Sequence, residues 1–309
     1  MVDPARGLDR LLSRCTFPDP GSAVTCAFSG GADSTALIAL ADAAGCRVTA
    51  IHVDHQLRAS SATEAGQAQV VAARIGVEFR LVTVDVERGP NLEARARGAR
   101  LAALPPDAMT GHTADDQAET MLINLIRGAG TAGLAGIRPG PTKPILALRR
   151  SETRQMCADL GLTVVEDPSN DDPRFVRNRV RREVLPLLDE IAGRDVTALL
   201  SRTAALLGSD ADLLDELAET LDPTDAKALA AADQRVSRRS VRVWLTSDGY
   251  PPDLATVDRV LDVARGTATA CEIGGGRRVE RKAQQLRIVG ERRVDSNPGM
   301  GSRADGNSL

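Results

Sequence analysis

Short apolar runs alternate with longer amphipathic runs from Ser22 to about residue 160. The apolar runs predict β-strands at 23–28, 48–53, 79–86, 108–110 and 145–148. The amphipathic runs predict helices at 34–44, 63–75, 92–104, 116–126 and 151–160. Apolar strands that alternate with helices are typical of a parallel sheet covered on both faces, so we predict an α/β fold with a Rossmann-like sheet. Ligands bind beyond the carboxyl ends of such strands, and the chemically active residues should therefore follow them.

The alternation stops beyond Leu188. Helices are predicted next, at 196–207, 210–221, 225–232, 237–246 and 254–264. Two short apolar runs at 270–273 and 286–289 then predict a terminal hairpin. We therefore predict a catalytic domain over 1–189, a smaller, mainly helical domain with the hairpin over 190–293, and a disordered Gly/Ser/Asn-rich tail over 294–309.

The first predicted strand leads directly into Ser29-Gly30-Gly31-Ala32-Asp33-Ser34, and a predicted helix follows. Glycines let a backbone approach a ligand, and helix N-terminal N–H groups favour an anion, to which Ser29 and Ser34 can add hydroxyl donors. Asp33 would repel a phosphate unless a divalent cation lay between them, which indicates a Mg²⁺-nucleotide. The lysine of the GxxxxGK[ST] loop is absent. The structural alternative is a tight turn with a serine cap, and it is disfavoured because Ser, Asp and Ser stand together at these fixed offsets.

Histidines follow two of the other predicted strands. His52, Asp54 and His55 end the second strand, and His112 ends the fourth. Taken singly, a histidine is more often structural than catalytic, and a zinc site made of the three histidines is a weaker alternative. Their common place at strand ends favours contact with a nucleotide.

Acidic residues open the helix that follows His112. Asp115 and Asp116 lie in its predicted first turn, where the helix dipole favours carboxylates for structural reasons alone. Asp115 and Glu119 are four residues apart, on one helical face. This spacing fits a site for a metal ion or an ammonium group.

Arginines concentrate in two segments. Arg97 and Arg100 lie three residues apart on a predicted helix, so one face can present both to an anion. Between 174 and 182 five arginines accompany Phe175, and either an exposed helix face or contacts with a nucleic-acid backbone would explain them. The candidate contact residues there are Arg174, Arg177, Asn178, Arg179, Arg181 and Arg182.

Composition restricts the class of protein. The 309 residues are 42% hydrophobic and 26% charged, with a formal net charge of -3, so nucleic acid would bind only through local basic patches. The five cysteines are scattered and never spaced C-x-x-C, which disfavours zinc ribbons, iron–sulfur clusters and a disulfide framework. Neither a signal peptide nor an apolar run of bilayer length is present in the sequence, so we expect a cytoplasmic protein without membrane contact.

In combination, the motifs resemble those of tRNA(Ile)-lysidine synthases, within the N-type ATP pyrophosphatase superfamily. The matching segments are SGGADS (29–34), HVDHQLR (52–58), NLEARARGAR (91–100), GHTADDQAET (111–120), RGAGTAGLAG (127–136) and EDPSNDDPRFVRNRVRREVLP (166–186). The chain departs from the family pattern at Leu101, Lys143 and Val165. Its length resembles a short form without the full C-terminal tRNA-binding domain.

The resemblance implies a reaction. ATP adenylates the carbon-2 oxygen of the cytidine at the first anticodon position of a tRNA(Ile) with the anticodon CAU. The side-chain amine of free L-lysine then attacks carbon-2, and lysidine, AMP and pyrophosphate result. ATP and Mg²⁺ are the implied cofactors, and a homodimer is left open. The alternatives are a tRNA thiolation enzyme of the same superfamily and a non-catalytic, ATP-dependent RNA-binding protein.

The resemblance also implies site residues. The expected catalytic residues are Asp33, Arg97, Arg100, His112, Asp115, Asp116 and Glu119. The expected nucleotide-binding residues are Ser29, Gly30, Gly31, Ala32, Asp33, Ser34, His52, Asp54 and His112, with Asp33 near the metal. The arginine-rich segment and the smaller domain are expected to contact the tRNA.

Overall fold

The computed structural model describes residues 4–56, 61–85, 95, 98–99, 101–165, 172–246 and 252–290. The chain forms two compact units, Met1–Gly208 and Ser209–Leu309. The division falls inside helix α10 (Thr197–Glu219), whereas the sequence pattern changes near residue 189. The three-part organisation given above remains a prediction.

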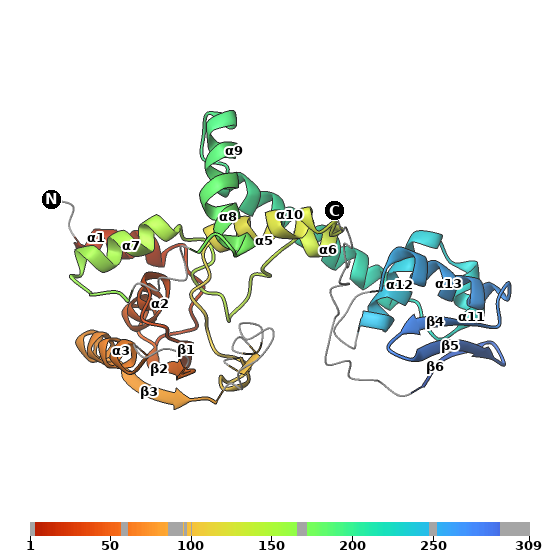
Figure 1. The fold of residues 1–309 in the computed structure, drawn as a ribbon, viewed down its shortest axis with the longest axis horizontal. Helices are drawn as coiled ribbons and strands as arrows, with labels where there is room; N and C mark the ends of the chain where they lie inside the picture. The colour runs from red at the N-terminus through yellow and green to blue at the C-terminus, as the bar shows by residue number, and fades with distance from the viewer. Residues whose placement is uncertain are drawn as a thin grey trace, which may run out of the picture. The chain divides into compact units, whose positions relative to one another are not determined.

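The first unit contains a parallel sheet in the order β1-β2-β3 (Figure 1), formed by β1 (Ala23–Ala27), β2 (Arg47–Asp54) and β3 (Glu78–Thr83). The register pairs Cys26 with Ala50 and Ala50 with Phe79. Helices flank this sheet, which confirms the predicted Rossmann-like α/β class. All the strands run the same way, so β1 and β2 deliver their following loops to one edge.

Two predicted strands differ from the structure. In the 108–110 run, Met109 forms a single parallel bridge with Cys26, and the Ala27 N–H donates to the Met109 carbonyl at 2.8 Å. The run is therefore aligned with β1 without forming a full strand. The strand predicted at 145–148 is wrong, because this segment forms turns. Its apolar pattern reflects burial, since Ile145 and Leu148 are both fully buried in the core.

Four predicted helices are present with shifted ends: α2 (Ala32–Ala43), α3 (Ser61–Ile75), α5 (Ala114–Ile126) and α7 (Arg150–Asp159). Helix α2 packs against β1, β2, α3 and α7, and its Leu37, Ile38 and Leu40 are fully buried. Burying one such side chain stabilises the fold by about 2 kcal/mol. The short helices α1 (Pro4–Leu12) and α6 (Thr131–Leu134) contact α7 and α5, respectively. The helix predicted at 92–104 lies largely outside the described residues.

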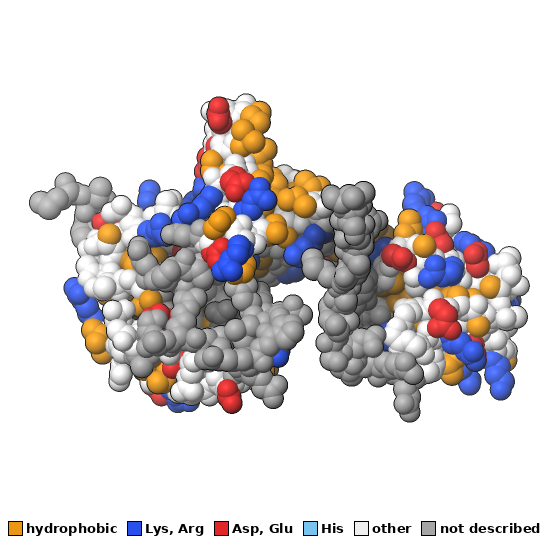
Figure 2. All heavy atoms as spheres, viewed as in Figure 1, with side chains coloured by type: hydrophobic (Ala, Val, Ile, Leu, Met, Phe, Trp, Pro, Cys, Tyr) orange, Lys and Arg blue, Asp and Glu red, His pale blue; other side chains and the backbone are white. Residues whose placement is uncertain are grey.

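The chain then forms α8 (Val176–Arg179), the π-helical segment η2 (Val180–Val184) and α9 (Leu185–Ala192). A small core joins these to α5 through Ala118, Leu122 and Val180. Figure 2 shows hydrophobic side chains along α9, where Leu187 and Ile191 are exposed. The core contacts fix the arginine-rich segment against the helix that carries Asp115 to Glu119.

The second unit contains α11 (Ala226–Ala231), α12 (Gln234–Thr246), α13 (Leu254–Arg265) and an antiparallel sheet. Its strands are β4 (Ala270–Gly274), β5 (Arg277–Lys282) and β6 (Gln285–Val289). The predicted two-stranded hairpin is therefore wrong, because β5 lies between its two strands. The helices predicted at 196–207 and 210–221 are the single helix α10. Along the described residues, no helix combines the length and apolarity required to cross a membrane.

Candidate active site

The turn between β1 and α2 has the geometry of an anion site. Gly30 has φ +82°, a conformation that L side chains rarely adopt, and Gly31 is the N-cap of α2. The Ser34 hydroxyl donates to the Gly31 carbonyl at 2.9 Å, and the Ser29 N–H donates to Ser34 Oγ at 3.2 Å. These bonds hold the turn in shape, and the first N–H groups of α2 have no partner within the helix. The turn can therefore present N–H and hydroxyl donors to a phosphate.

Two other segments lie against this turn. A Cβ added to Gly111 would lie 2.7 Å from the Asp33 carbonyl oxygen, so only glycine allows the loop before α5 to pass this close. On the other side, the Val165 N–H donates to the Gly30 carbonyl at 2.9 Å. The phosphate-type turn, the start of α5 and the chain after α7 therefore meet at one edge of the sheet.

Arg150, the first residue of α7, connects the acidic residues of α2 and α5. Its Nη1 lies 2.8 Å from Glu119 and its Nη2 lies 2.9 Å from Asp116. Its Nε lies 3.3 Å from Oδ2 of Asp33. One largely buried guanidinium therefore brings the carboxylate of Asp33 on α2 together with two carboxylates of α5.

Glu119 is fully buried and binds three guanidinium groups. Besides Arg150, Arg177 Nε donates to it at 2.7 Å and Arg181 Nε at 2.7 Å. Burial alone would raise the pKa of Glu119, but the hydrogen bonds and positive charges of the three arginines outweigh it and lower this pKa to about 2. Glu119 is therefore ionised at neutral pH and is already paired.

Asp115 and Asp116 make different contacts. Oδ2 of Asp115 accepts hydrogen bonds from the Arg150 backbone N–H at 2.7 Å and from Arg149 Nε at 3.1 Å, and Arg149 also pairs with Asp195. Oδ2 of Asp116 accepts the N–H of Thr113 at 2.9 Å, which forms a capping box at the start of α5. Asp115 therefore anchors α7, whereas Oδ1 of Asp116 faces the arginines.

Asp33 is the carboxylate within the phosphate-type turn at 29–34. Oγ1 of Thr153 donates to its Oδ1 at 2.5 Å, while its Oδ2 has the longer contact with Arg150. Burial raises the pKa of Asp33, although the Thr153 hydrogen bond and the Arg150 charge oppose this. A divalent cation at Oδ2 would favour the ionised form and would complete its shell with phosphate and water oxygens. The described residues contain no group of three or more His, Cys, Asp or Glu side chains that could hold a metal ion by themselves.

The histidines make internal contacts. His52 is buried in β2, its Nδ1 lies 2.9 Å from the Phe28 carbonyl, and burial lowers its pKa. His112 Nδ1 lies 2.7 Å from Thr110 Oγ1. Asp54 accepts the Gln56 N–H at 2.8 Å. His52 and Asp54 therefore support the strand end, and the nucleotide contacts predicted for them and for His112 remain predictions. The zinc alternative gains no support from the part of the chain that is described.

The arginine-rich segment divides into two groups. Arg177 and Arg181 turn inward to Glu119, as described above. Arg174 and Arg179 are exposed and pair with neighbouring carboxylates, Asp172 and Glu183. The Asn178 amide donates to the Asp172 carbonyl at 2.9 Å, and Arg182 is exposed. Their tRNA contacts remain predictions, and Arg97 and Arg100 lie outside the described residues.

Sequence reasoning missed the first turn of α7. Arg149, Arg150 and Thr153 were not among the candidates, yet all three contact candidate carboxylates. Arg149 and Arg150 directly follow the 145–148 apolar run, so a pair of cations after a buried segment was the available signal. The contacts of these cations depend on the turn at 145–148, which the apolar pattern of that run does not reveal.

Comparison with known proteins supports this fold. The U34-tRNA thiolase NcsA of Methanococcus maripaludis, solved with its 4Fe-4S cluster, matches with a TM-score of 0.53 and 16% identity. The match covers 66% of this chain and 78% of that chain. At this identity the likeness shows a shared fold alone.

Sequence relatives identify the family. Residues 4–188 match the PP-loop domain family. The chain is 41% identical over 296 residues to the tRNA(Ile)-lysidine synthase of Rhodococcus erythropolis, with 89% of each chain covered. It is 40% identical to the tRNA(Ile)-lysidine synthase of Nocardia farcinica, covering 89% of this chain and 91% of that one. The chain therefore belongs to the tRNA(Ile)-lysidine synthase family of PP-loop proteins.

Proposed function

We propose that this protein uses ATP to join L-lysine to carbon-2 of the cytidine at the first anticodon position of tRNA(Ile) with the anticodon CAU, in the cytoplasm. The products are lysidine, AMP and pyrophosphate. The names of the relatives support the tRNA substrate. The structural observation that carries the proposal is Arg150, which contacts Asp33 beside the phosphate-type turn and both Asp116 and Glu119 on α5. The residues proposed to bind the nucleotide and those proposed to bind the amine therefore share one partner, Arg150.

The turn from Ser29 to Ser34 would hold the phosphates of ATP. Its N–H groups and hydroxyls suit the negative charge that develops on departing pyrophosphate. Asp33 would hold Mg²⁺, which spreads that charge when it is bound. Fixing ATP beside the cytidine would contribute several kcal/mol to lowering the barrier, about 7 or more in favourable cases.

The structure favours different roles for the acidic residues. Glu119 is a weak base because its pKa is about 2, so it is suited to holding Arg177 and Arg181 rather than to accepting a proton. Asp115 is occupied by α7. We assign contact with the lysine ammonium to Oδ1 of Asp116, which Arg150 and Arg177 contact until an anionic ligand draws one of them away.

Charge balance suggests that an anion binds first. Three carboxylates, of Asp33, Asp116 and Glu119, face three guanidinium groups, of Arg150, Arg177 and Arg181. The net charge of this network is zero, so it attracts an ammonium group weakly. A phosphate that drew one guanidinium away would leave a net negative charge for lysine. Binding of an anionic substrate should therefore increase the affinity for lysine.

Mass analysis of nucleosides tests the proposal. Unmodified tRNA(Ile) would be incubated with the protein, ATP, Mg²⁺ and isotope-labelled lysine, then digested. We expect one labelled lysidine per tRNA, and pyrophosphate release that requires both lysine and the CAU tRNA. Release driven by a sulfur donor, with a thiolated nucleoside as product, would replace this proposal with a thiolation enzyme. Tight binding of ATP and tRNA without any product would indicate a non-catalytic RNA-binding protein.

A further inference from the structure

Lys143 lies beside the loop that leads to the acidic helix. It closes a turn in which its N–H donates to the Gly140 carbonyl at 2.9 Å. The preceding residue, Thr142, accepts the N–H of Thr110 at 2.9 Å, and Thr110 contacts His112. Lys143 therefore lies next to the segment 109–112, which is bridged to β1 at Met109 and leads into the candidate site.

The ammonium group of Lys143 has few partners. Its Nζ makes two long contacts, both with Thr142: 3.3 Å to the carbonyl and 3.4 Å to Oγ1. Within the described part of the chain, no carboxylate forms an ion pair with it, whereas Arg149 and Arg150 each contact carboxylates. Lys143 is half-buried, and burial lowers its pKa. A partly desolvated cation without a counter-ion is costly, and an anionic ligand would offset that cost.

The neighbouring residues indicate which anion fits. Thr110 and His112 flank Gly111, where an added Cβ would collide with the backbone of Asp33 and Ser34 in the first turn of α2. Lys143 is thus joined through two short segments to the turn that has the geometry of a phosphate site. We propose that Lys143 binds a phosphate group of the nucleotide, adding a positive charge to the N–H and hydroxyl donors of the turn at 29–34. This inference rests on the proposed function only for the use of ATP.

A compact point charge suits this task. Lysine binds phosphate through three rotatable donors on a flexible stem, so it can stay in contact with the phosphate while ATP is converted to its products. The arginines around Glu119 pair with carboxylates, whereas Lys143 has no such pair within the described residues. Lys143 can therefore contribute to nucleotide affinity without giving up an ion pair.

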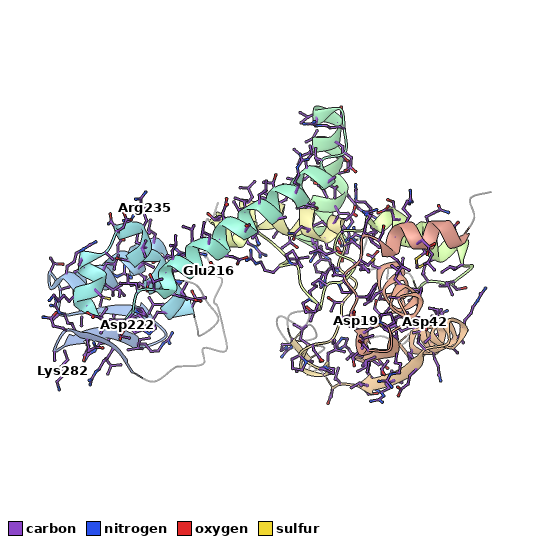
Figure 3. The ribbon with its side chains drawn as sticks, turned by 180° about the vertical axis from the view of Figure 1, so that it is seen from behind. Asp19, Asp42, Glu216, Asp222, Arg235 and Lys282 are labelled. Carbon is purple, nitrogen blue, oxygen red and sulfur yellow. The ribbon has the colours of Figure 1, made fainter. Side chains whose placement is uncertain are left out.

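Differential amine labelling tests the inference on the unmodified protein. The chain has three lysines, Lys143, Lys227 and Lys282, so each is followed separately by mass spectrometry. Lys227 and Lys282 belong to the second unit and are exposed, and Lys282 lies at its surface (Figure 3), so they are internal controls. An amine-reactive ester would be applied with Mg²⁺ alone, then with Mg²⁺ and ATP, pyrophosphate, AMP or tRNA.

We expect ATP to slow labelling of Lys143 at least fivefold and to leave Lys227 and Lys282 unchanged. Protection by pyrophosphate alone would assign Lys143 to the departing phosphates, and protection by AMP alone would assign it to the α-phosphate. Equal labelling of Lys143 with and without saturating ATP would overturn the inference. Protection by tRNA but not by ATP would overturn it as well, because the bound phosphate would then belong to RNA.

Substitution gives an independent measurement. Lys143→Met keeps the length of the stem and removes the charge, so ATP affinity measured by calorimetry should fall about tenfold or more. Lys143→Arg should retain affinity within about threefold, and Lys227→Met is the matched control. Unchanged ATP affinity in a folded Lys143→Met variant would sink the inference, even if the wild-type protein makes lysidine. If the wild-type protein makes no lysidine while ATP still protects Lys143, only the proposed function fails.

Discussion

The hydroxyl of Thr153 lies 2.5 Å from Oδ1 of Asp33. Thr153 is fully buried in the first unit, and its other contact is the Arg150 carbonyl at 2.9 Å. A charged carboxylate is a stronger acceptor than a carbonyl, so the Thr153 hydroxyl donates its single proton to Asp33. This contact fixes the orientation of Asp33 and leaves Oδ2 as the oxygen that a metal ion can approach.

Thr153→Val should weaken the binding of Mg²⁺-ATP. Valine keeps the shape of threonine but cannot donate, so Asp33 loses the hydrogen bond that holds its ionised form. We expect the Mg²⁺ concentration for half-maximal ATP binding to rise about tenfold, which corresponds to about 1.4 kcal/mol. Thr153→Ser is the control, because it keeps the hydroxyl and should restore most of the affinity. Equal Mg²⁺ dependence in the valine variant and the wild type would contradict the positioning role of Thr153.

Asp33→Asn should abolish pyrophosphate release and leave tRNA retention nearly unchanged. The amide keeps the size of the side chain but removes the charge that a divalent cation requires. Filter binding of labelled tRNA and a coupled pyrophosphate assay, both at saturating Mg²⁺, separate the two effects. A parallel loss of tRNA binding would show that Asp33 supports the structure of the site rather than the metal.

Arg150→Met should destabilise the first unit. Removing this guanidinium leaves Asp33, Asp116 and Glu119 with less compensation, and breaking one partner of a buried ion pair costs about 3–5 kcal/mol. Urea unfolding at neutral pH measures this cost. Arg80→Met is a suitable control, because Arg80 forms an exposed pair with Glu78. Surface pairs contribute about 0–1 kcal/mol to the free energy of unfolding. A similar loss in both variants would therefore show that Arg150 stabilises the fold no more than a surface pair does.

The sequence was informative where a local rule determined the structure. Gly30 and Gly31 follow an apolar strand and precede a helix, and this order alone predicts the turn. The place of Asp115 and Asp116 in the first turn of α5 was also predicted, because the helix dipole favours carboxylates there. The contact of Arg150 with Asp33 was not, because it joins residues more than one hundred positions apart and depends on how α7 packs on α2.

The same distinction explains the wrong strand at 145–148. Ile145 and Leu148 are apolar because both are buried, and periodicity over four residues cannot separate a buried turn from a buried strand. In the opposite sense, β5 was missed because its arginines hide an alternating pattern in which Val279 alone is fully buried. In both cases tertiary packing, rather than local preference, decided the structure.

Arg179→Ala should weaken tRNA binding and reduce its salt dependence. Arg179 is exposed and pairs with Glu183 at i,i+4, and such a surface pair can be broken at little cost when a phosphate approaches. Each lost phosphate contact should lower the slope of log affinity against log salt by about one unit. Arg181→Ala is the informative comparison, because Arg181 is held by Glu119 and its loss should leave that slope nearly unchanged. If the slope is unchanged in Arg179→Ala, its side chain belongs to a solvated surface.

Glu119→Gln should change how stability depends on pH. The pKa of Glu119 in the folded protein, about 2, lies below its ordinary value of 4.5, so its ionised form stabilises the fold above pH 4.5. That contribution, on the order of 3 kcal/mol, should be lost progressively as the pH falls from 4.5 towards 2. Asp33 acts in the opposite direction, because its pKa is raised and acidification relieves the burial of its charge.

The measurement is urea unfolding of the wild type and Glu119→Gln between pH 7 and pH 3. The wild type should lose more stability than the variant over the acidic part of this range, because glutamine has no proton to take up. The variant should also be less stable at pH 7, since Arg177 and Arg181 lose the charge that holds them. Parallel pH profiles for the two proteins would mean that Glu119 keeps an ordinary pKa, and that solvent reaches this carboxylate in the working protein.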